Sequence, residues 1–139
     1  MAGPGEPEAC ATMAFALEEF RAALDERDEM RRRQVAEKAW LAVTEATDHY
    51  LGQVGIVFPA DIEPAEMHRF RRTRLEDMKD LGHVDAERVL GSYLDLRDAL
   101  HGDCFYGGGC DRDTLTKYLV RARNFVADIT GCRVPSVPG

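Results

Sequence analysis

The sequence lacks the features that mark several large classes of protein. No run is long and apolar enough to cross a bilayer, which needs about 20 apolar residues. The opening MAGPGEPEAC holds acids and prolines where a secretory signal needs positive charge followed by an apolar run. No segment alternates apolar and polar residues over a useful length, and GIVF is too short for a strand. These absences predict an all-helical, cytoplasmic protein with no membrane contact.

Cysteine is sparse, and its spacing matches no metal motif. The four cysteines, Cys10, Cys104, Cys110 and Cys132, form no CxxC pair. Buried or unreactive thiols are the expected state, and a disulfide is the alternative for a chain from a hyperthermophile. A zinc site at His101, Cys104 and Cys110 would lack a fourth ligand. We therefore expect no metal and no cofactor.

Positive charges are outnumbered by acids overall but are locally concentrated. The net charge of −7 gives no overall field that would attract nucleic acid. Residues 1–30 carry eight acids and two arginines, whereas residues 66–74, EMHRFRRTR, carry four arginines. Two interpretations of these arginines stay open: a solvated face balanced by the acidic first helix, or a surface that binds an RNA backbone. The arginines concerned are Arg69, Arg71, Arg72 and Arg74.

Apolar residues recur every three or four positions in five segments, which predicts five amphipathic helices. The expected helices span about 8–26, 28–51, 64–80, 84–106 and 111–130. Gly107–Gly109 ends the fourth helix, and it lacks the Lys-Ser/Thr pair of a phosphate-binding loop. We expect one all-α domain over residues 9–131, an antiparallel bundle of four to five helices. Residues 1–8 are expected to be disordered and residues 132–139 to form a loose tail.

The segment 86–106, AERVLGSYLDLRDALHGDCFY, carries the pattern that most needs an explanation. At about 100° per residue, Arg97 and His101 stack on one helix face that is otherwise apolar. The apolar members of that face are Leu90, Leu94, Cys104 and Phe105. In the structural interpretation, Arg97 pairs with Glu37 or Asp48 of the second helix, and His101 donates to a carbonyl near the glycines. In the functional interpretation, the pair binds a ligand.

Two stretches resemble motifs of the HEPN superfamily, a name that abbreviates higher eukaryotes and prokaryotes nucleotide-binding. They are AEKAW, residues 36–40, and LHGDCFY, residues 100–106, and the nearest branch is the archaeal PaREP-like one. The resemblance covers about residues 9–131. It implies a HEPN-like helical bundle that pairs into a homodimer. Many members are metal-independent ribonucleases with an Arg and a His, and others are nucleotide-binding modules or non-catalytic partners of a nucleotidyltransferase.

Arg97 and His101 occupy the positions that match the family's Arg–His pair. The match departs from the family in two ways: the spacer is only three residues long, and Asp98 follows the arginine. An acid beside Arg97 weakens its attraction for phosphate. We therefore expect a small helical module that binds nucleotide, RNA or a partner protein without catalysis.

Two alternatives remain. The first is a metal-independent endoribonuclease of toxin type, in which His101 takes the 2′-hydroxyl proton and Arg97 stabilises the charge that develops on phosphate. Tyr106 would add a hydroxyl at the rim of the groove between two subunits. The second alternative is an interaction scaffold with no ligand.

Overall fold

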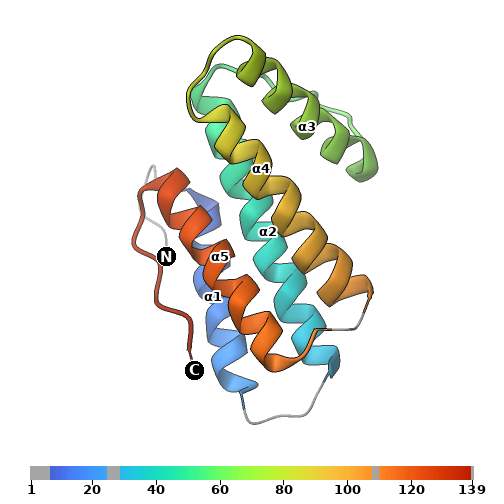
Figure 1. The fold of residues 1–139 in the computed structure, drawn as a ribbon, viewed down its shortest axis with the longest axis vertical. Helices are drawn as coiled ribbons and strands as arrows, with labels where there is room; N and C mark the ends of the chain where they lie inside the picture. The colour runs from blue at the N-terminus through green and yellow to red at the C-terminus, as the bar shows by residue number, and fades with distance from the viewer. Residues whose placement is uncertain (1–6, 25–28, 108–109, 139) are drawn as a thin grey trace.

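The computed structural model describes residues 7–24, 29–107 and 110–138, and within these ranges it contains helices and no strand (Figure 1). The helices are α1 (Glu8–Ala22), α2 (Glu29–Gln53), α3 (Pro64–Asp80), α4 (Ala86–Leu96), η1 (Arg97–Tyr106) and α5 (Arg112–Thr130). η1 continues directly from α4, so five helices pack together. The prediction of an all-α protein is confirmed. Of the N-terminus that we expected to be disordered, residues 1–6 lie outside the described residues, and α1 already begins at Glu8.

The core is built around α2, which contacts every other helix. The small residues of α2 allow this, because they let neighbouring backbones approach closely. Its fully buried alanines are Ala36, Ala39, Ala42 and Ala46. α3 packs mainly against α4, and Figure 1 shows it standing off from the other helices.

The helix ends follow local signals in the sequence. Pro64 occupies the first turn of α3, where a missing N–H costs nothing. The Asp111 carboxylate accepts a hydrogen bond from the Thr114 N–H at 2.8 Å and so caps α5, and this bond lowers the pKa of Asp111. Gly131 ends α5 with φ of 73°, a left-handed conformation that favours glycine.

The fourth helix changes type at Arg97. From Arg97 to Tyr106 the chain forms a π-helix, in which each N–H bonds to the carbonyl five residues earlier. The single α-helix predicted over residues 84–106 is therefore wrong in its second half. The spacing of apolar residues in the sequence does not distinguish a short π-helix from an α-helix. π-Helical turns occur frequently at functional sites.

The face that α4 and η1 turn to the core is shifted by one residue from the predicted one. Its large buried residues are Val89, Tyr93, Leu96 and Leu100, and Ala86, Ala99 and Cys104 are buried with them. Leu90 and Leu94, which we expected in the core, are only half-buried. Two neighbouring faces of this segment are both apolar. Periodicity alone therefore does not determine which of the two faces packs against the core. Arg97 and His101 lie at the edge of the core rather than within its stripe.

The cysteines form two disulfides, so the prediction of free thiols is wrong. Cys10 bonds to Cys132, and Cys104 bonds to Cys110. The zinc hypothesis fails with it, because both proposed thiolate ligands are joined to each other. No helix in the described ranges has the length and apolar character needed to cross a membrane. The cytoplasmic location stays a prediction, and the disulfides do not support it, since they are rare in reduced compartments.

The segment after α5 is not the loose tail that we predicted. Cys132 ties it to the first turn of α1. Val134 is buried in the core, and Arg123 of α5 donates from Nη2 to its carbonyl at 2.7 Å. A covalent link and a buried side chain therefore hold the chain against the bundle beyond Thr130.

Candidate functional site

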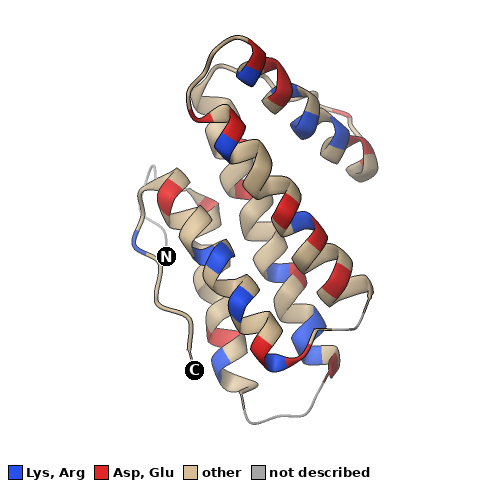
Figure 2. Ribbon diagram, viewed as in Figure 1, with Lys and Arg blue, Asp and Glu red and all other residues tan. Residues whose placement is uncertain are grey.

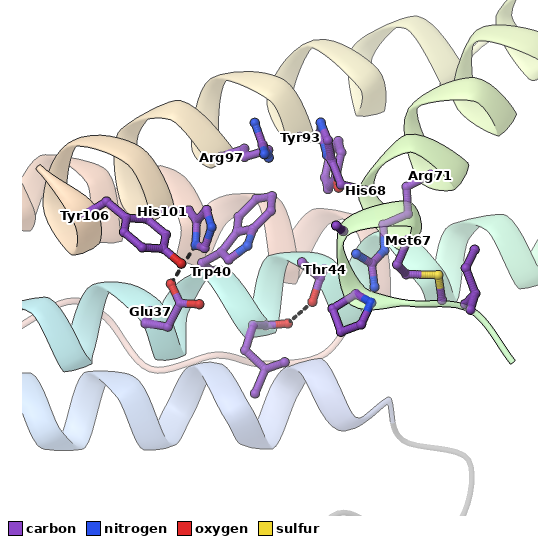
Figure 3. A pocket seen from close by; sticks show the side chains of 14 residues that line it. Glu37, Trp40, Thr44, Met67, His68, Arg71, Tyr93, Arg97, His101 and Tyr106 are labelled. Atoms are coloured by element: carbon purple, nitrogen blue, oxygen red, sulfur yellow. Dashed lines mark hydrogen bonds and ion pairs between the residues drawn. The ribbon is translucent and has the colours of Figure 1, made fainter.

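A groove of about 680 Å³ lies between α2, the beginning of α3 and the helix formed by α4 and η1. Figure 3 shows the labelled side chains converging on this space from all three. α2 contributes Glu37, Trp40 and Thr44, and α3 contributes His68 and Arg71. The remaining polar and aromatic lining comes from Tyr93, Arg97, His101 and Tyr106. The structure thus brings the predicted Arg97, His101 and Tyr106 to one concave surface.

Arg97 lines the groove, and no side chain in the described part of the chain binds its guanidinium. Among the residues that the structure describes, its guanidinium makes no hydrogen bond or ion pair. The structural interpretation assigned it to Glu37 or Asp48, and that assignment is wrong. Glu37 accepts a hydrogen bond from His101, and Asp48 binds Arg71. A half-buried arginine with an open fork of donors is suited to an incoming anion.

His101 is fixed by a carboxylate and by aromatic rings. Its Nδ1 lies 2.9 Å from Oε2 of Glu37, not near a carbonyl of the glycine segment as we expected. The Nδ1 proton is donated to Glu37, so Nε2 is the ring atom left to meet a ligand. The ring contacts Tyr106 edge to face at 4.8 Å and stacks on Phe105 at 6.0 Å between centroids. His101 is therefore held in one orientation.

A second network crosses the groove from α2 to α3 and α4. Arg71 binds Asp48 with both ends of its fork, Nε to Oδ1 at 2.7 Å and Nη2 to Oδ2 at 3.0 Å. Arg71 also interacts with the hydroxyl of Tyr93, which lies 2.8 Å from Nδ1 of His68. Burial raises the pKa of Tyr93. The network ties the first turns of α3 to the bundle and so fixes the width of the groove.

His68 is neutral at physiological pH. Burial, followed by the positive charge of Arg97, Arg72 and Arg71, lowers its pKa to about 4. Sequence reasoning missed both His68 and Tyr93. The available signal was the spacing of His68 and Arg71, which are three residues apart and so share a helix face.

The four α3 arginines do not gather at the groove. Figure 2 shows positive and negative residues mixed along α3. Of the four, only Arg71 lines the groove. Arg72 lies 3.9 Å from Glu76, and Arg74 lies 3.1 Å from Asp77. Arg69 is exposed outside the groove. An RNA-binding role for this helix stays a prediction.

Three hydrogen bonds and a disulfide hold the last turn of η1, which carries Phe105 and Tyr106. Arg33 of α2 donates from Nε to the Phe105 carbonyl at 2.6 Å and from Nη2 to the Tyr106 carbonyl at 3.2 Å. The Gly107 N–H donates to the Gly102 carbonyl at 2.8 Å. The disulfide of Cys104 fixes the same turn to the segment before α5. Sequence reasoning did not foresee the role of Arg33.

No protein-family model, curated protein or solved structure matches the chain. The HEPN resemblance, the homodimer and the nucleotidyltransferase partner that it implies therefore stay predictions. Across the described ranges, no group of His, Cys, Asp and Glu side chains is arranged to hold a metal ion.

Proposed function

We propose that the protein binds a nucleotide in the groove, with Arg97 on the phosphate and without catalysis. The observation that carries the proposal is the open guanidinium of Arg97 on a concave surface. Arginine presents a planar fork of donors that matches the oxygens of phosphate. Both acids that we considered as its partners are occupied by other side chains.

The rest of the groove suits the other parts of a nucleotide. Tyr106 is 67% exposed at the rim, where a base can stack on its ring. Trp40 forms part of the wall, and His68 and Thr44 add neutral polar groups. An apolar surface with a few fixed polar groups is the usual composition of a small-molecule site.

Trp40 provides the test, because it is the only tryptophan in the chain and it lines the groove. We expect its fluorescence to change saturably as adenosine monophosphate is added. In Arg97→Gln the affinity falls about tenfold or more, since a hydrogen bond to a charged group contributes about 1.5–3 kcal/mol. Arg121→Gln, a variant on α5 outside the groove, is the matched control and binds like the wild type. Equal affinity in Arg97→Gln and the wild type would disprove the proposal.

A second candidate function is metal-independent cleavage of RNA, and the geometry of His101 favours it. Glu37 holds Nδ1, which leaves Nε2 free to take the proton from a 2′-hydroxyl. The 2′-oxygen then bonds to phosphorus and the bond to the 5′-oxygen breaks, with Arg97 stabilising the charge on phosphate. The 5′-oxygen receives a proton from water or Tyr106. The products are a 2′,3′-cyclic phosphate and a 5′-hydroxyl.

Cleavage of labelled single-stranded RNA in EDTA separates the two candidates. The ribonuclease candidate predicts cleavage by the wild type that His101→Ala abolishes. His83→Ala is the matched control, because His83 is exposed and lies outside the groove. A folded wild type that binds nucleotide and leaves RNA intact would eliminate the ribonuclease candidate.

A further inference from the structure

We infer that the groove selects ligands that place one phosphate group in it, as a nucleoside monophosphate does, over nucleoside diphosphates and triphosphates. This inference rests on the proposed binding of nucleotides and adds the ligand class. It follows from how the charges of the groove are already engaged.

Only one cation is open to a phosphate among the described residues that line the groove. The arginines there are Arg71 and Arg97, and no lysine contributes. Both ends of the Arg71 fork are held by Asp48, and the Arg71 side chain is only 14% exposed. Of the guanidinium groups that line the groove in the described ranges, that of Arg97 is therefore the one left free.

A second phosphate would meet groups that do not attract it. Glu37 lines the groove with a side chain that is 37% exposed, and its carboxylate repels further negative charge. His68 adds no positive charge at neutral pH, because burial and nearby arginines lower its pKa to about 4. Asp98, which follows Arg97, is exposed beside it.

Sites for triphosphates are built differently. They surround the β- and γ-phosphates with a lysine, backbone N–H groups and a magnesium ion held by side-chain oxygens. The groove has no lysine, and no metal-binding cluster is found in the described part of the chain. The negative charge of a second or third phosphate would thus have no positive group of the groove to balance it.

The experiment compares adenosine, AMP, ADP and ATP by Trp40 fluorescence in EDTA. We expect AMP to bind about tenfold or more tightly than adenosine, and ADP and ATP to bind more weakly than AMP. We expect Glu37→Gln to strengthen ATP binding by about threefold or more, and AMP binding by less. The glutamine oxygen can still accept the proton of His101, so this variant keeps the site in shape. Glu66→Gln, on the exposed surface of α3 outside the groove, is the matched control.

The possible results separate failure of the single-phosphate inference from failure of the proposed nucleotide binding. If ADP or ATP binds the wild type as tightly as AMP or more tightly, the single-phosphate inference is wrong while nucleotide binding stands. The same conclusion follows if Glu37→Gln strengthens AMP and ATP binding equally. If a folded wild type binds none of the nucleotides, the proposed function itself fails, and the inference with it.

Discussion

Nδ1 of His101 lies 2.9 Å from Oε2 of Glu37, a contact that joins residues 64 positions apart in the chain. It also brings together the two stretches that carry the HEPN resemblance. Glu37 and Trp40 come from AEKAW, and His101 and Tyr106 come from LHGDCFY. All four line one groove. Two short motifs that look unrelated in the sequence therefore form a single surface.

Loss of the Glu37 carboxylate should weaken the link between α2 and η1. In Glu37→Ala the His101 N–H loses its acceptor, and we expect the free energy of unfolding to fall by about 0.5–1.5 kcal/mol. Glu37→Gln keeps an acceptor oxygen and should stay close to the wild type. Urea unfolding measures both. Identical losses in the two variants would show that the hydrogen bond contributes nothing.

The Cys10–Cys132 disulfide should dominate covalent stabilisation, because its cysteines are separated by 122 residues. We expect Cys10→Ser with Cys132→Ser to lower the free energy of unfolding by about 4–5 kcal/mol, since a long closed loop restricts the unfolded chain most. The Cys104–Cys110 bond spans a separation of 6, and its removal should cost about 2 kcal/mol. Denaturant unfolding of the two double variants tests this order. A larger loss from the short loop would contradict it.

The two disulfides should also differ in their effect on the groove. Cys104 lies in η1 three residues after His101, whereas Cys10 and Cys132 join α1 to the segment after α5. We expect Cys104→Ser with Cys110→Ser to weaken AMP binding, and Cys10→Ser with Cys132→Ser to leave it unchanged in the folded protein. Trp40 fluorescence titrations under conditions where both variants are folded give the answer. Equal affinities would show that the short disulfide does not position the site.

Gly107 should be intolerant of a side chain. A Cβ atom there would lie 2.8 Å from the Asp103 carbonyl oxygen, which is too close for a real contact. We expect Gly107→Ala to lower stability and to disturb Tyr106. Gly91→Ala is the matched control, because nothing lies within 4 Å of its Cβ position in α4 and alanine favours a helix by about 1 kcal/mol. We expect the midpoint of thermal unfolding to fall in Gly107→Ala and to rise in Gly91→Ala. Unchanged stability in Gly107→Ala would contradict it.

His68 should make stability fall as the solution is acidified. Its pKa is about 4 in the folded protein, below the ordinary value of 6.5, so the unfolded chain binds the proton more readily. Its contribution is present above pH 6.5 and is lost as the pH falls towards 4. In His68→Gln the dependence over this window should be flatter, whereas His83→Gln should behave like the wild type. An unchanged slope in His68→Gln would refute this assignment.

The sequence predicted the positions of the helices well, because apolar residues that recur every three or four positions indicate an amphipathic helix. The third helix was expected over residues 64–80, and α3 spans Pro64–Asp80. The π-helical form of η1 was missed, since a hydrogen-bond register leaves no mark in composition. The Cys10–Cys132 pair was missed for a related reason: its proximity depends on how the whole bundle closes.

The site was predicted in part. Arg97 and His101 were identified from their place on an apolar face, and both line the groove. The contacts of Glu37 and Asp48 were not, because both acids lie on α2 and spacing along one helix cannot say which side chain of another helix each one meets. His68 and Tyr93 join the groove only because α3 folds back on α4, a tertiary relationship that no local pattern encodes.

Binding of phosphate by the open guanidinium of Arg97 can be observed by NMR of the arginine Nε–Hε groups. The Arg97 signal is assigned by its loss in Arg97→Gln. On addition of AMP we predict that this signal shifts saturably, while that of Arg71, held by Asp48, moves little. An Arg97 signal that stays in place while AMP binds would contradict the account.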